Sequence, residues 1–141
     1  SMRKEEFIKA KVKEYYWEED VNCATTTLKV LAEHFGIQLN EQIIDCSIGM
    51  QGAGEYGAQC GLVEGVLMFL GLYGRKKEVS NHDIILYCNE FAKQFEKNFT
   101  SLQCSVLRPE GFHVNNPPHL CETLTCNTIK FSIDFISKLK V

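Results

Sequence analysis

The sequence has little proline, no excess of basic charge and no low-complexity stretch. Its 141 residues contain only 3 prolines and 10 glycines, so no segment has the composition of a linker. The 15 Lys and Arg residues against 18 Asp and Glu residues leave a net charge of −3, whereas a nucleic-acid-binding domain normally carries a basic stripe. We therefore expect a single domain over residues 1–141 and no nucleic acid partner.

A long apolar run is also lacking. The longest one, residues 66–73, is far shorter than the roughly 20 residues that span a bilayer. The first residues, Ser1 to Glu6, are polar and lack the apolar core of a secretory signal, and Ser1 before Met2 resembles a remnant of expression. These absences predict a cytoplasmic protein without a transmembrane segment.

Alternation of apolar and polar residues, which is typical of strands, is absent as well. The chain is 45% hydrophobic, and its apolar residues recur at helical spacing. We expect an all-α bundle of five to six helices with a glycine-rich loop, residues 49–57. The expected helices cover residues 4–17, 22–34, 40–48, 60–73, 80–99 and 119–139. The segment after the loop is apolar on nearly all sides, which predicts a central, buried helix.

Cysteine, in contrast, is plentiful. Seven cysteines among 141 residues is about 5%, below the share typical of a small disulfide scaffold, and an odd number cannot pair completely. No two of them form a Cys-x-x-Cys pair. In a reducing compartment, metal binding, redox chemistry or burial explains such cysteines better than structural disulfides. The seven are Cys23, Cys46, Cys60, Cys88, Cys104, Cys121 and Cys126.

The expected helices separate these cysteines into groups. Cys23, Cys60 and Cys121 fall in the first turn of a helix, where free backbone N–H groups and the positive dipole end stabilise a thiolate. We therefore expect a lowered pKa at these three thiols. Three others fall inside helices, and we interpret them as small buried hydrophobic side chains. These are Cys46, Cys88 and Cys126.

Four of the cysteines and a glycine motif give the chain a resemblance to a known family. Asn22-Cys23-Ala24, then Cys60-Gly61-Leu62-Val63-Glu64-Gly65, then Cys104 and Cys121 resemble the redox-active C_GCAxxG_C_C family in order and spacing. Members of that family are helical and carry four characteristic cysteines, with a CGAxxG motif after a glycine-rich stretch. Leu62 stands where the family usually has Ala. The resemblance implies a thiol-based redox role or sulfur ligation of a metal centre.

Thiol–disulfide exchange requires an attacking thiol of low pKa, a resolving thiol within bonding distance and solvent access. Cys60 is the candidate attacking thiol, and Cys23, Cys104 or Cys121 is the candidate resolving thiol. On this hypothesis the chain is a thiol–disulfide oxidoreductase or a redox carrier with an unidentified redox partner. The sequence leaves open whether the chain is an enzyme and whether it forms a homodimer.

Metal ligation by the same four cysteines is the alternative hypothesis. An iron–sulfur cluster or a zinc ion needs three or four thiolates at one point. His113 and His119 could replace a sulfur, although a lone histidine in a loop is more often solvated. A third hypothesis is a helical interaction module in which all seven cysteines are buried without any chemistry.

The glycines beside the cysteines are candidates for cofactor binding. Gly52, Gly54 and Gly57 can adopt positive φ and direct backbone N–H groups at a sulfur atom or a cluster. Gly61 and Gly65, four residues apart, leave one helical face bare, so that another backbone or a cofactor can approach closely.

Overall fold

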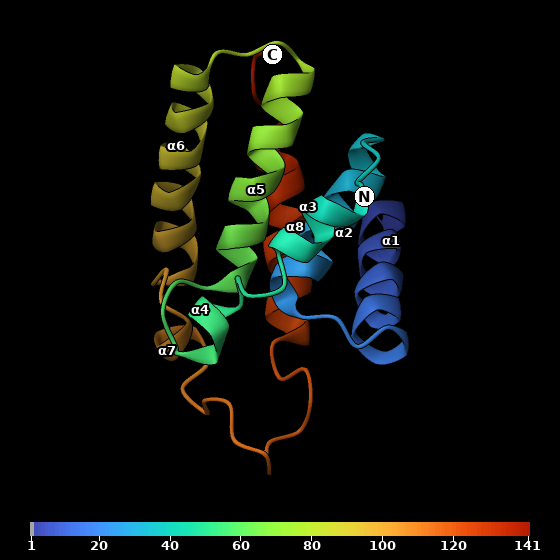
Figure 1. The fold of residues 1–141 in the computed structure, drawn as a ribbon, viewed down its shortest axis with the longest axis vertical. Coiled ribbons are helices and arrows are strands. Elements are labelled where there is room, and N and C mark those ends of the chain that lie inside the picture. The colour runs from blue at the N-terminus through green and yellow to red at the C-terminus, as the bar shows by residue number, and fades with distance from the viewer. Residues whose placement is uncertain (1) are drawn as a thin grey trace.

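The computed structural model describes residues 2–141, and within this range the chain is helical apart from loops and one isolated β-bridge. The all-α class is confirmed (Figure 1). The helices are α1 (Met2–Lys13), the π-helix η1 (Glu14–Glu18), α2 (Cys23–Phe35), α3 (Glu41–Cys46), α4 (Gly52–Glu55), α5 (Gly61–Lys76), α6 (Asn81–Phe99), α7 (Cys104–Leu107) and α8 (Glu122–Ser137). The short helices α4 and α7 were not expected, and the interpretation of Ser1 lies outside the described residues.

Several helix ends follow directly from the local sequence. The side chains of Asn22, Asn40 and Ser80 each accept a hydrogen bond from a backbone N–H three residues further on, and so begin α2, α3 and α6. Such capping satisfies donors that have no partner within the helix. Gly36 ends α2 in the left-handed conformation, with a φ of 69°.

Two helix ends differ from the expectation. Gly74 does not end α5, which continues to Lys76. Instead, Gly74 gives α6 room, because a Cβ atom there would lie 2.6 Å from Cγ1 of Ile84. The last helix begins at Glu122 rather than near His119, since His119 has a left-handed φ of 57°.

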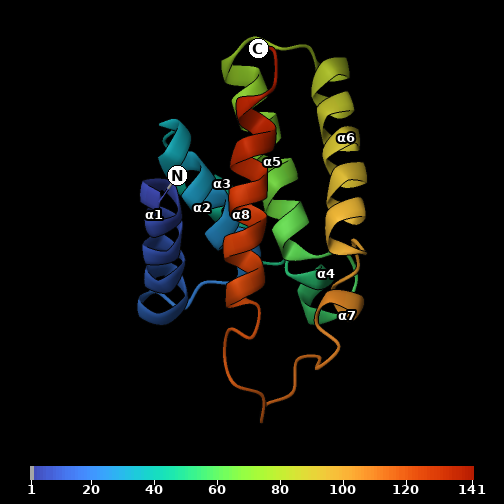
Figure 2. The same cartoon turned by 180° about the vertical axis from the view of Figure 1, so that it is seen from behind.

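The helix α5 occupies the centre of the bundle, as its apolar surface predicts (Figures 1 and 2). Its most extensive contact is with α2, while α6 and α8 also pack against it. Gly65 allows the close approach of α2, because a Cβ atom at Gly65 would lie 2.6 Å from the carbonyl oxygen of Ala24. Leu62 does not disturb this packing and is 1% exposed.

The first residues of α5 and α8 lie toward the same end of the molecule, the lower one in Figures 1 and 2. The short helices α4 and α7 lie at this end too, together with the long connection that leads into α8. In residues 2–141, no helix is both long and apolar enough to cross a membrane. The fold therefore gathers helix starts and loops at one end, where a site can form.

Candidate functional site

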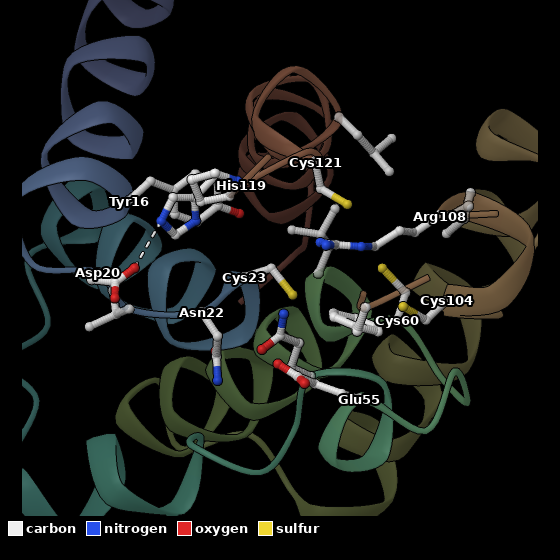
Figure 3. A pocket seen from close by; sticks show the side chains of 17 residues that line it. Tyr16, Asp20, Asn22, Cys23, Glu55, Cys60, Cys104, Arg108, His119 and Cys121 are labelled. Atoms are coloured by element: carbon white, nitrogen blue, oxygen red, sulfur yellow. Dashed lines mark hydrogen bonds and ion pairs between the residues drawn. The ribbon is translucent and has the colours of Figure 1, made fainter. Parts of the chain in front are cut away.

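A cavity of about 310 Å³ lies where several helices begin. Cys23, Cys60, Cys104 and Cys121 all line it (Figure 3). Cys23 and Cys104 are the first residues of α2 and α7, while Cys60 and Cys121 directly precede α5 and α8. The sequence placed three of the four at helix starts, and α7 adds Cys104. We call this space the cysteine cavity.

Two segments of the cavity wall meet in the isolated antiparallel β-bridge between Gln59 and Gln103. The N–H of Cys60 donates to the carbonyl oxygen of Leu102 at 2.8 Å, and the N–H of Cys104 donates to that of Ala58 at 2.7 Å. Because side chains alternate along paired strands, Cys60 and Cys104 lie on the same face as diagonal neighbours. Both side chains are buried, at 5% and 7% exposure.

Two glycines make room for cavity cysteines. A Cβ atom at Gly61 would overlap the sulfur of Cys23 and lie 3.2 Å from the backbone nitrogen of Ala24. A Cβ atom at Gly52 would lie 3.2 Å from the sulfur of Cys104. These glycines therefore position the thiols by allowing close packing behind them.

The glycine-rich loop does adopt positive φ, at Gly52, Gly54 and Gly57. Its backbone N–H groups are nevertheless used within the loop: that of Gly54 donates to Gly49 and that of Gly57 to Gly52. The N–H groups of Gly54 and Gly57 therefore have partners other than a sulfur atom. None of the four glycines proposed for cofactor binding, Gly52, Gly54, Gly57 and Gly61, lines the cavity.

Burial sets the pKa values of the four thiols. It raises the pKa of Cys60 to about 11, although the backbone N–H groups of Leu62 and Val63 act in the opposite direction. Burial also raises the pKa of each of the other three thiols above its ordinary value, those of Cys23, Cys104 and Cys121. The expected lowering at helix starts is therefore wrong, because desolvation of a thiolate outweighs the contribution of the helix ends.

Arg108 is a cavity residue that the sequence patterns did not identify. Its Nε donates to the carbonyl oxygen of Gly111 at 2.8 Å, and its guanidinium lies 4.2 Å from the ring centroid of Phe112. The positive charge of the guanidinium also acts on Cys121, where it lowers the pKa of the thiol against the larger, opposite effect of burial. Figure 3 shows the side chain reaching into the cavity toward the cysteines. The segment that carries Arg108 has no helical periodicity, so the spacing of its residues did not indicate that Arg108 lines the cavity.

His119 also lines the cavity, and its surroundings correct the expectation of a solvated loop histidine. Its side chain is only 13% exposed, and its Nε2 lies 3.1 Å from Oδ1 of Asp20. The ring stacks on Tyr16 of η1, with centroids 4.5 Å apart. His113 is exposed and does not line the cavity.

The remaining cysteines lie elsewhere, and not all are buried. Cys88 and Cys126 are half-buried against the hydrophobic core, in keeping with a packing role. Cys46, at the end of α3, is exposed, so its interpretation as a buried side chain is wrong. It ends a six-residue helix that buries none of its residues.

The cysteine cavity does not have the geometry of a metal centre. Within residues 2–141, no group of three or more His, Cys, Asp or Glu side chains is arranged to hold a metal ion. Zinc and iron–sulfur sites require that convergence. The four sulfur atoms share a cavity without meeting at one point, and all seven cysteines are free thiols.

Comparison with known proteins gives one match. The model of a family described as "Putative redox-active protein (C_GCAxxG_C_C)" matches residues 21–134. The matched range contains the four cavity cysteines and Arg108. Searches of curated proteins and of solved structures found no match.

Proposed function

We propose, because the chain belongs to the redox-active C_GCAxxG_C_C family, that its cavity cysteines carry out thiol–disulfide exchange. One observation carries the proposal: four cysteines from well-separated parts of the chain line a single cavity. Exchange needs only two sulfur atoms that can bond, whereas a metal centre needs three or four at one point. The arrangement of the thiols therefore favours exchange.

Cys60 and Cys104 are the proposed redox couple. Diagonal neighbours across antiparallel strands have Cα atoms about 7–8 Å apart. A disulfide needs Cα atoms within about 6.8 Å, so a small movement of the two paired segments suffices for bond formation. Cys23 and Cys121 line the same cavity and are the alternative partners of Cys60.

The proposed reaction transfers two electrons to a disulfide of the redox partner. The thiolate of Cys60 attacks one sulfur of that disulfide, and the first partner thiol leaves with the electron pair of the broken bond. Cys104 then attacks the sulfur of Cys60 in the mixed disulfide and releases the second partner thiol. A Cys60–Cys104 disulfide forms, and the two protons of the cysteines end on the two partner thiols.

The raised pKa of Cys60 determines how fast this reaction runs. At neutral pH nearly all of the thiol is protonated, since burial raises its pKa to about 11. Because the thiolate is the nucleophile, we expect slow exchange near neutral pH and a rate that increases as the pH rises toward that value. Because the Cys60 thiol is buried, a reaction partner must reach it inside the cavity.

Substitution of Cys60 tests the proposal. The protein is oxidised with a low-molecular-weight disulfide, and the resulting disulfides are mapped by mass spectrometry. We expect a Cys60–Cys104 disulfide in the original protein and none in the Cys60→Ser variant. Cys88→Ser is the matched control, because Cys88 is half-buried on α6 outside the cavity. It is expected to retain the disulfide and to lose only fold stability.

Two results would contradict thiol exchange. Equal loss of disulfide formation in Cys60→Ser and Cys88→Ser would show that the cavity is not the reactive site. The metal content of protein purified without oxygen addresses the alternative. Stoichiometric iron or zinc that is lost in Cys60→Ser would establish a metal centre on the same cysteines.

A further inference from the structure

Arg108 brings a positive charge to the cysteine cavity. The side chain is half-buried, its partners are the Gly111 carbonyl and the Phe112 ring, and its charge lowers the pKa of the Cys121 thiol. Across residues 2–141, the ion pairs formed with carboxylates do not include Arg108. A partly buried guanidinium is most stable with an anionic partner, which it binds through paired N–H groups.

The cavity also contains two carboxylates, and their placement matters for the choice of ligand. The Asp20 carboxylate lies 3.1 Å from Nε2 of His119, and the Asp20 side chain is 86% exposed. Glu55 is exposed as well. Solvent and salt screen exposed charges of this kind. The Arg108 guanidinium is instead held by the Gly111 carbonyl and the Phe112 ring, and it is near enough to Cys121 to lower the pKa of that thiol.

The direction of the helices adds to the positive electrostatic potential that Arg108 produces in the cavity. α2, α5 and α8 have 13, 16 and 16 residues, and all three begin beside the cavity. The N-terminal end of each helix carries a partial positive charge. Together with Arg108, these ends favour a negative group inside the cavity over a positive one.

Resting on the proposed thiol exchange, we propose that the disulfide substrate is small and negatively charged, and that Arg108 binds its anionic group. The volume of about 310 Å³ is at the lower end of the range for small-molecule sites, which begins near 300 Å³. The charge of the substrate meets the guanidinium, and its disulfide faces the cavity thiols. Two electrons pass from two cavity cysteines to the substrate disulfide, which leaves as two anionic thiols.

Three disulfides of similar size test this selectivity: dithiodiglycolate, which is anionic, hydroxyethyl disulfide, which is neutral, and cystamine, which is cationic. The rate at which each one forms a disulfide between cavity cysteines is measured by quenching and mass spectrometry. A Cys46→Ser background removes the exposed thiol. Each rate is divided by the rate of the same reagent with free cysteine, which corrects for intrinsic reactivity.

We expect dithiodiglycolate to react fastest on this corrected scale and cystamine slowest. Arg108→Gln is expected to lower the dithiodiglycolate rate about tenfold and to leave the hydroxyethyl disulfide rate within about twofold, as for loss of one charge-assisted hydrogen bond. Arg108→Lys retains the charge and is expected to recover part of the rate. Arg75→Gln removes the same charge at the far end of α5, and is expected to change none of the three rates.

The outcomes separate this inference from the proposed function. An equal fall in all three rates in Arg108→Gln would mean that Arg108 only stabilises a thiolate, and would overturn the substrate assignment. Unchanged rates in a folded Arg108→Gln protein, checked by circular dichroism, would overturn it too. Failure of the unsubstituted protein to form any cavity disulfide with the three reagents would instead overturn thiol exchange itself.

Discussion

The thiol of Cys60 experiences two opposing influences. Two backbone N–H groups at the start of α5 stabilise its thiolate, and burial to 5% exposure destabilises that thiolate. Burial has the larger effect, so the folded protein holds the sulfur as a neutral thiol. The same burial makes the thiol slow to react. It also makes the stability of the folded state depend on pH in the alkaline range.

We predict that Cys60 contributes to a loss of stability above about pH 9. Below the ordinary thiol pKa of 9.0 the group is protonated in both states, and its contribution to stability is fully present. As the pH rises toward the folded pKa of about 11, only the unfolded chain releases the proton, so the free energy of unfolding falls. The two-unit difference corresponds to about 3 kcal/mol.

Urea unfolding of the original protein and of Cys60→Ala, at about pH 8 and about pH 10.5, measures this effect. The drop in unfolding free energy between the two pH values is expected to be smaller in Cys60→Ala. Cys46→Ala is the control, because Cys46 is exposed and its replacement is expected to keep the full drop. The same drop in all three proteins would show that Cys60 is not buried as a neutral thiol.

Among the helices, α2 and α5 form the most extensive pair and carry Cys23 and Cys60 at their starts. Gly65 lies where the two helices are closest, with its Cβ position 2.6 Å from the Ala24 carbonyl oxygen and 2.9 Å from Cβ of Thr27. Gly71, on the same helix, has no atom of another element within 4 Å of its Cβ position. The two glycines therefore differ only in what surrounds them.

We predict opposite effects for alanine at these two positions. Gly65→Ala forces α2 away from α5 and is expected to lower the unfolding free energy by about 1–3 kcal/mol, as overpacking does. Gly71→Ala fills open space in a helix interior and is expected to raise it by up to about 1 kcal/mol. Urea unfolding of the two variants measures both changes in unfolding free energy. A stabilised Gly65→Ala protein would mean that α2 and α5 are not packed this closely.

Over the whole molecule, features set by local sequence were predictable and features set by tertiary packing were not. Helical periodicity gave the all-α fold, and Asn22 and Ser80 marked helix starts because capping involves residues three apart. The cavity role of Arg108 depends on the path of an irregular loop, for which periodicity gives no signal. The sign of the thiol pKa shifts depends on burial, which helix position alone does not determine. The four site cysteines came from the family resemblance.

The cavity draws its walls from positions between Tyr16 and Leu124, so it exists only when distant parts of the chain have folded together. We therefore predict that the cavity and the bundle unfold in one cooperative transition, as expected for a single domain. Trp17, the one tryptophan, reports on the cavity end, because its Nε1 donates to Glu122 at 2.8 Å and its ring contacts His119 edge-on. The urea midpoint from tryptophan fluorescence should equal the midpoint from helical circular dichroism. A lower fluorescence midpoint would show that the cavity end opens while α5 and its neighbours stay folded, which would make the site a separate, less stable unit.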